Sequence, residues 1–213
     1  MQLIIFGAPG AGKGTQSKIL CERFNLVHLS TGDLLRKEVK TKSELGYVIK
    51  KILDAGELVP NNIVGELLNI AIKSVKNKDG YILDGFPRTV DQAKMLEGIF
   101  KENNFKKPII LFLTADEKVV IERLSNRRQC SECSSIVIIT AVKDNCCPNC
   151  GAKNSLFKRD DDNEETIKNR LEVYFKTTFP VLKFFKDEGE KIIEVLGTDP
   201  IEKVTKNILA KVK

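Results

Sequence analysis

Residues 7–15 read GAPGAGKGT, and this glycine-rich segment constrains the fold more than any other part of the chain. It follows the apolar run LIIF, which predicts a buried strand, and it precedes an amphipathic pattern that predicts a helix from about Lys13 to Phe24. A glycine-rich turn between a strand and a helix N-terminus attracts anions, because backbone N–H groups and the helix dipole both favour negative charge. The segment therefore predicts a phosphate-binding loop on an α/β sheet.

The loop departs from the common form G-x-x-x-x-G-K-[ST] at one position. Gly7, Gly12 and Lys13 are in place, but the next residue is Gly14, and the hydroxyl arrives one position late, at Thr15. In the common form that hydroxyl binds Mg²⁺ directly. A hydroxyl at Thr15 would approach the metal from a different angle, so we expect the nucleotide phosphates and water to hold much of the Mg²⁺.

Asp84 is expected to hold some of the water molecules that bind this Mg²⁺. The segment YILD at residues 81–84 is a short apolar strand that ends in this acid, and the segment is followed by glycine. An aspartate at the carboxyl end of a strand can bind Mg²⁺ directly or through water, although an Asp-Gly pair is also a common turn. Together, the loop and the strand-end acid predict a site for a magnesium nucleotide.

Apolar segments alternate with helical patterns along most of the chain, which predicts an α/β fold with a central five-stranded parallel sheet flanked by helices. The expected strands are 2–6, 27–29, 81–84, 108–113 and 191–196. The expected helices are 13–24, 32–54 with a break near Gly46, Pro60 to about Val75, 90–102, 117–125, 163–187 with a bend near Pro180, and 200–212. Ser30 or Thr31 is expected to cap the second helix, with Asp33 at its positive end.

The net charge of +6 is compatible with a lysine-rich surface, with nucleic-acid binding or with a pocket for small polyanions. The chain has no run of five like charges, which argues against nucleic acid. It also lacks a long uncharged apolar run, and no basic segment precedes the first apolar run. We therefore expect a cytoplasmic protein without a membrane span or signal peptide.

Five of the six cysteines fall within residues 130–150, where CSEC and CPNC form two C-x₂-C pairs separated by 13 residues. This spacing is typical of a four-thiolate zinc site, and we assign the ligands to Cys130, Cys133, Cys147 and Cys150. Cys146 could replace Cys147 through a wider spacing, whereas Cys21 is expected in the core. Four protein ligands leave no open position, so the metal would be structural. Alternatively, the segment could be a zinc ribbon that binds nucleic acid, in which case the protein would be a binding module and not an enzyme.

Several long motifs resemble the adenylate kinase family in order and approximate spacing, and the resemblance covers residues 1 to about 200. They are GAPGAGKGTQ, HLSTGDLLR, GELVP, DGFPRTVDQA, ERLSNRR and RDDDNEETIKNRL. The chain is most similar to the bacterial form with a long zinc-bearing lid. The resemblance implies a monomeric transferase that converts MgATP and AMP into two ADP. It also implies a core (1–29, 60–125 and 161–213), an AMP-binding insert (30–59) and a lid (126–160).

The resemblance also assigns roles to individual residues. The catalytic charges would be Lys13, Arg88, Arg127, Arg159 and Arg170. ATP would be bound by Gly10, Ala11, Gly12, Lys13, Gly14, Thr15, Arg123, Arg127, Ile136, Val137 and the backbone near Thr198. AMP would be bound by Thr31, Arg36, Glu57, Leu58, Val59, Gly85, Phe86, Pro87, Arg88, Gln92, Arg159 and Arg170. Water-mediated contacts to Mg²⁺ would come from Asp84 and Thr15.

A kinase for another nucleoside monophosphate, such as UMP or CMP, is the close alternative. Thr31 and Gln92 favour AMP, because an amide can pair with both a donor and an acceptor on the adenine edge. His28, the one histidine, is expected to be structural, since phosphoryl transfer to an ionised phosphate needs no base. The chain departs from the family at Ser134, Ser135, Ile136 and Val137, where relatives usually carry glycine and a Tyr-His pair.

Overall fold

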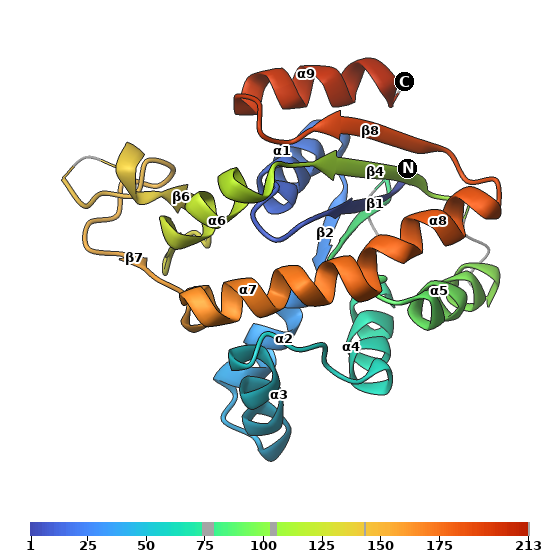
Figure 1. Cartoon of the computed structure of the whole chain (residues 1–213), viewed down its shortest axis with the longest axis horizontal. Coiled ribbons are helices and arrows are strands. Elements are labelled where there is room, and N and C mark those ends of the chain that lie inside the picture. The colour runs from blue at the N-terminus through green and yellow to red at the C-terminus, as the bar shows by residue number, and fades with distance from the viewer. Residues whose placement is uncertain (74–78, 103–105, 143, 213) are drawn as a thin grey trace.

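The computed structural model describes residues 1–73, 79–102, 106–142 and 144–212. Its centre is a five-stranded parallel sheet with the strand order β2-β3-β1-β4-β8 (Figure 1). The strands are β1 (Gln2–Gly7), β2 (Val27–Ser30), β3 (Tyr81–Asp84), β4 (Ile109–Thr114) and β8 (Ile192–Leu196). The predicted fold class is therefore confirmed.

Helices cover both faces of this sheet, which explains why its strands are apolar runs rather than alternating patterns. Ile4 and Phe6 of β1 point into a core under α4 (Asn61–Lys73), α5 (Val90–Glu102) and α8 (Phe179–Asp187). Leu3 and Ile5 point into a second core under α1 (Lys13–Phe24) and α9 (Ile201–Lys211). Figure 1 shows α9 and α8 on opposite sides of the sheet. All parallel strands end at one edge, where the loops gather.

The helices α2 (Thr31–Lys40) and α3 (Glu44–Asp54) pack on each other and lie below α7 (Glu164–Val173) in Figure 1. The break predicted near Gly46 is present but lies at residues 41–43, and Gly46 itself is in the first turn of α3. Ser43 caps α3 by accepting a hydrogen bond from the Gly46 N–H. A Cβ at Gly46 would lie 2.8 Å from the Glu38 carbonyl oxygen, so glycine permits the two helices to approach closely.

The cysteine-rich segment forms a small antiparallel sheet of order β6-β5-β7. It consists of β5 (Arg127–Cys130), β6 (Ile136–Ile138) and β7 (Leu156–Phe157), with a short 3₁₀ turn at Ile139–Ala141. The preceding helix α6 (Glu117–Ser125) joins this sheet to the core, and a 3₁₀ turn at Asp160–Asp162 leads back to it. In Figure 1 the segment extends away from the central sheet.

A long helical stretch returns across the core. It runs as α7 (Glu164–Val173), a π-helical turn at Tyr174–Thr178, and α8. The irregularity thus lies immediately before Pro180, close to where a bend was predicted, because proline cannot donate the next helical hydrogen bond. The expected end, near Val75, of the helix that begins at Pro60 lies outside the described residues. Among the residues that are described, no helix is long and apolar enough to cross a membrane.

Candidate active site

The loop that joins β1 to α1 lies at the carboxyl edge of the sheet. Gly10 and Gly12 have φ values of 82° and 94°, a left-handed conformation that glycine adopts without strain. The Ala11 N–H donates to the Ala8 carbonyl at 3.1 Å and closes the turn. Gly12 is the N-cap of α1 and provides no side chain to cap it, so the first N–H groups of the helix can receive an external anion.

Lys13 folds back over this loop. Its Nζ donates to the carbonyl oxygens of Gly7 and Ala8 at 2.8 and 2.9 Å. Burial lowers the pKa of Lys13 from 10.5 to about 8, and Asp84 opposes the shift while Arg88, Arg170 and Arg127 reinforce it. The lysine therefore shares one small region with three predicted phosphate-binding arginines, and additional negative charge there would be strongly stabilised.

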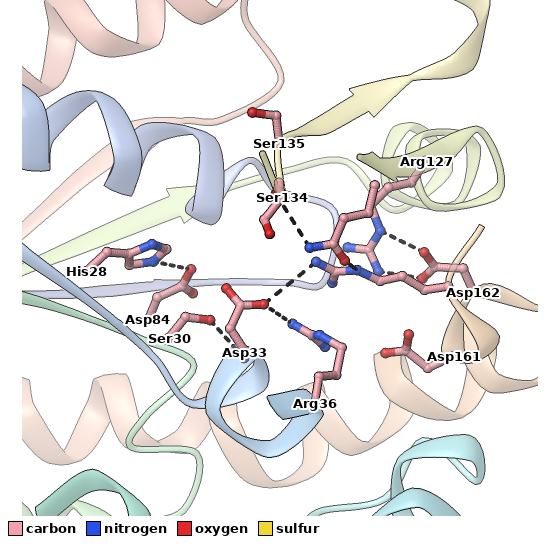
Figure 2. A network of polar contacts seen from close by, with 12 residues as sticks. His28, Ser30, Asp33, Arg36, Asp84, Arg127, Ser134, Ser135, Asp161 and Asp162 are labelled. Atoms are coloured by element: carbon pink, nitrogen blue, oxygen red, sulfur yellow. Dashed lines mark hydrogen bonds and ion pairs between the residues drawn. The ribbon is translucent and has the colours of Figure 1, made fainter. Parts of the chain in front are cut away.

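Asp84 lies beside the loop at the end of β3. Burial opposes its ionisation, but the hydrogen bond from His28 and the charge of Lys13 outweigh that effect and lower the pKa of Asp84. His28 Nε2 lies 3.2 Å from Asp84 Oδ2, as Figure 2 shows. A Cβ at Gly14 would lie 3.7 Å from the same oxygen, so Gly14 leaves space beside the carboxylate. Thr15 follows in the first turn of α1.

Among the predicted phosphate-binding arginines, which we call the arginine cluster, Arg127 and Arg170 are held by the carboxylates of Asp161 and Asp162. Arg127 forms a bidentate pair with Asp162, with Nε and Nη2 at 2.7 and 2.5 Å from the two oxygens (Figure 2). Arg170 Nη1 lies 3.2 Å from Asp162 Oδ1 and 3.0 Å from Asp161 Oδ2. The side chain of Asp162 is fully buried. Burial opposes ionisation of Asp161, but four surrounding arginines, led by Arg170, outweigh it and lower the pKa of Asp161.

Arg36, Arg88 and Arg159 are held by Asp33 or by neutral oxygen atoms. Arg36 Nη2 lies 2.7 Å from Asp33 Oδ1, and Arg159 Nη2 lies 4.0 Å from the same atom. The Nε of Arg159 donates to Gln129, and the Nε of Arg88 donates to the Gly85 carbonyl, both at 2.8 Å. Burial lowers the pKa of Arg88 and Arg159, but a guanidinium remains charged in proteins. The site thus concentrates permanent positive charge.

Three acidic partners in this network were not predicted as site residues. Asp33 was assigned only to the helix dipole, and Asp161 and Asp162 were noted only within the motif RDDDNEETIKNRL. A signal was present, because an acidic run directly after Arg159 predicts local pairing with basic groups. The sequence does not show which arginines fold against it.

A small recess lies between β3, α2 and the segment after α3. Its lining includes seven of the residues predicted to bind AMP, together with three apolar side chains: Thr31, Glu57, Leu58, Val59, Gly85, Arg88 and Gln92, with Leu35, Leu53 and Val64. Thr31 Oγ1 donates to the Gly85 carbonyl at 2.9 Å. The amide of Gln92 accepts from the Arg88 N–H at 2.7 Å and donates to Asn61 Oδ1 at 2.8 Å.

Other predicted residues lie outside this recess. The side chain of Phe86 is buried in the core, and the neighbouring Pro87 is also buried, so neither presents its side chain to the recess. Arg123 donates to the carbonyl oxygens of Gly197 and Thr198 at 2.8 and 3.0 Å, which ties α6 to the loop after β8. Ile136 and Val137 lie on β6 of the small sheet, half-buried.

The four assigned cysteines converge in the small sheet. The Sγ atoms of Cys130, Cys133, Cys147 and Cys150 all lie within 4.8 Å of one another. Cys146 is not part of this group, and its thiol faces the Asp144 carbonyl at 3.3 Å. The alternative in which Cys146 replaces Cys147 therefore does not fit the geometry. Cys21 packs against the core on α1, as predicted, and burial raises the pKa of its thiol to about 11.

Comparisons with known proteins agree over nearly the whole chain. A family model described as adenylate kinase matches residues 5–190. Adenylate kinase from Caldicellulosiruptor saccharolyticus is 41% identical over 212 residues, which cover 98% of this chain and 97% of that protein. Adenylate kinase from Methanocella arvoryzae is 40% identical over 216 residues, with 100% and 99% covered. Adenylate kinase from Clostridium botulinum strain Loch Maree is 39% identical over 209 residues, with 98% and 96% covered.

The substitution Asp162→Asn tests whether the buried carboxylate holds the arginines. It leaves the guanidinium groups of Arg127 and Arg170 close together without their shared counter-charge, and we expect the free energy of unfolding to fall by about 3 kcal/mol. Urea denaturation at neutral pH measures the change. In the control Glu164→Gln, which breaks the exposed ion pair with Lys168, stability should be almost unchanged. Equal effects of the two substitutions would contradict this account of the cluster.

Proposed function

Because the chain belongs to the adenylate kinase family, we propose that it catalyses MgATP + AMP ⇌ 2 ADP at the carboxyl edge of its central sheet. The observation that carries this proposal is the convergence of the phosphate loop with an arginine cluster. Lys13 is close enough to Arg88, Arg127 and Arg170 for each to lower its pKa. Transfer between two polyphosphates requires this concentration of positive charge, because the reaction depends on alignment and charge stabilisation.

We propose the division into parts that the sequence implies: a core of residues 1–29, 60–125 and 161–213, an AMP-binding insert at 30–59, and a lid at 126–160. In support, α2 and α3 pack on each other, and the small antiparallel sheet is separate from the central one. We further propose a cytoplasmic monomer whose partners are ATP, AMP and ADP. That last proposal rests on the family resemblance alone.

The acceptor AMP would occupy the recess beside β3. Its apolar walls suit a base, while Thr31 and Gln92 offer a hydroxyl and an amide. The amide of Gln92 is now engaged by the Arg88 N–H and Asn61, so base binding would exchange one of these contacts for the adenine edge. Arg36 and Arg88 would then face the AMP phosphate, and the backbone of residues 57–59 would border the base.

The donor ATP would place its phosphates on the loop formed by Gly10, Ala11, Gly12, Lys13, Gly14 and Thr15. The uncapped N–H groups at the start of α1 support this assignment. Arg123 supports the expected adenine site, because it orders the backbone at Gly197 and Thr198. Ile136 and Val137 would cover the donor from the lid.

Phosphoryl transfer would take place between Lys13 and the arginines Arg88, Arg127, Arg159 and Arg170. Asp161, Asp162 and Asp33 hold several of these arginines in the structure, and phosphate oxygens would replace part of those contacts. The attacking AMP phosphate has a second pKa near 6, so it is largely ionised at neutral pH and needs no general base. Closure of the lid and the AMP-binding insert would exclude water, which would otherwise compete as acceptor.

Magnesium bound with ATP neutralises charge on the β- and γ-phosphates. Asp84 and Thr15 would anchor its water ligands. The low pKa of Asp84 supports this role, because the carboxylate stays ionised.

We also propose that Cys130, Cys133, Cys147 and Cys150 hold a structural zinc ion in the lid. Four sulfur atoms within 4.8 Å of one another match the donor set of a closed tetrahedral site. Such a site has no open position for substrate. The metal would stabilise the lid, because the small sheet has little apolar core of its own.

The reaction is tested by coupling ADP formation from ATP and AMP to a spectroscopic readout. We expect ADP from the unaltered protein and a loss of at least about a hundredfold in Lys13→Met, because the loop loses its phosphate cation. The control Lys206→Met, at an exposed lysine on α9, should remain active. No ADP from the unaltered protein, or equal activity of the two variants, would refute the proposal. A preference for CMP, UMP or GMP over AMP would show that the acceptor is wrong.

Removal of the metal tests the structural zinc. We expect one zinc ion per chain by elemental analysis, and we expect chelation to lower the thermal melting temperature more than it lowers activity in the cold. Cys133→Ser should lose the metal, whereas Cys146→Ser should retain it, because only Cys133 lies in the sulfur cluster. Equal loss of stability and activity at low temperature, or equal metal loss in both variants, would exclude this role.

A further inference from the structure

Gln129 is a buried polar side chain in the middle strand of the lid sheet, with only 9% of its surface exposed. Both ends of its amide are engaged. Its Oε1 accepts a hydrogen bond from Arg159 Nε at 2.8 Å, and its Nε2 donates to the Ser134 carbonyl at 3.4 Å. Figure 2 places Ser134 in the same network as Asp33 and Arg36. No role in the proposed reaction has been assigned to Gln129 so far.

The backbone around Gln129 fixes where its amide can lie. Gln129 pairs with Ile136 on one side and with Phe157 on the other, so its Cα is held by two neighbouring strands. The acceptor Ser134 is held as well, because its N–H donates to the Cys130 carbonyl at 3.0 Å within a tight turn. Rotation of the amide would break at least one buried hydrogen bond, which is costly.

This contact determines how Arg159 is presented. The guanidinium is planar, so a hydrogen bond at Nε fixes the plane and leaves the two terminal nitrogens for another partner. Nη2 lies 4.0 Å from Asp33 Oδ1, which shows that a negatively charged group can approach that end. Arg36, Arg127 and Asp161 also act on Arg159 through their charges. The terminal nitrogens of Arg159 therefore lie beside Asp33, among the charged side chains where phosphate is expected.

The group that accepts the hydrogen bond from Arg159 Nε is uncharged, and this affects how strongly Arg159 can bind phosphate. Arg127 and Arg170 are paired with carboxylates, which neutralise part of their charge. The Nε of Arg159, like that of Arg88, is held by a neutral oxygen. An amide orients the guanidinium without competing electrostatically with phosphate, whereas a carboxylate in the same place would attract the cation away from it.

We propose that Gln129 is a positioning residue for the reaction: it holds Arg159 so that the terminal nitrogens contact the phosphoryl group during transfer. The inference rests on the proposed function and adds to it a residue that acts through Arg159. Because Arg159 and Gln129 both belong to the lid segment, the arginine would move with the lid and arrive already oriented.

Kinetics of Gln129→Met provide the first test. Methionine has a similar length but cannot accept from Arg159, so we expect kcat to fall about tenfold while the KM values for ATP and AMP stay within about twofold. The control Asn126→Ala removes another amide of the lid segment, one that donates to the Glu122 carbonyl at 3.0 Å, and should leave kcat unchanged. An unchanged kcat in Gln129→Met would overturn the proposal.

A double-mutant cycle separates positioning from a general structural role. In the Arg159→Lys variant, Gln129 has no guanidinium to orient. Adding Gln129→Met to that variant should therefore lower its kcat by less than a further factor of two. A further fall of about tenfold in that background would show that Gln129 acts elsewhere and would overturn the proposal.

Arginine Nε–H resonances provide a readout that does not depend on activity. In the unaltered protein we expect a slowly exchanging Nε–H signal from Arg159, lost in Gln129→Met and retained in Gln129→Glu, which keeps an acceptor. Loss in both variants, or in neither, would overturn the proposal. If the unaltered protein made no ADP, the proposed function would fail, while these resonances would still decide whether Gln129 holds Arg159.

Discussion

Concentrated and partly buried positive charge at the carboxyl edge of the sheet is the constraint on which the rest of the site depends. Burial lowers the pKa of Lys13 to about 8, and it also lowers the pKa of Arg88, Arg159 and Arg170. Such charges are expensive to bury without counter-charges. Asp84, Asp161 and Asp162 supply part of that compensation, and the phosphates of the substrates would supply the rest.

The same constraint explains how separate parts of the chain are joined. The carbonyl oxygens of Asp54 and Ala55, at the end of α3, accept hydrogen bonds from Thr166 and Asn169 of α7. The helix α7 also carries Arg170, so one element links the end of α3 to the arginine cluster. On the lid side, Arg127 is linked to the core by its pair with Asp162.

Local patterns were sufficient to predict most of the fold. The phosphate loop, the strands of the central sheet and the cysteine pairs are each defined by residues close together in the sequence. Each also serves one physical need: anion binding, burial or metal ligation. The sequence alone therefore identifies them. The helix break was expected near Gly46, and the structure places it at residues 41–43. In the structure this glycine is needed for close packing between α2 and α3, and Ser43 determines where α3 begins.

Contacts between distant segments could not be predicted in this way. His28 was expected to be structural, but the sequence does not show that it lies beside Asp84, 56 residues further along the chain. Likewise, an acidic run after Arg159 does not reveal that Asp162 pairs with Arg127, nor does a lid glutamine reveal that it faces Arg159. These pairings depend on how β5, the 3₁₀ turn and α7 meet, which no local pattern specifies.

The most direct measurement of the central claim is a crystal structure with an analogue that joins two adenosines through five phosphates. The account predicts one adenine in the recess with Thr31 and Gln92, and the other near Thr198. It also predicts that Lys13, Arg88, Arg127, Arg159 and Arg170 contact the phosphates between them. A complex in which the phosphates bypass these cations, or in which only one adenosine finds a site, would contradict the account.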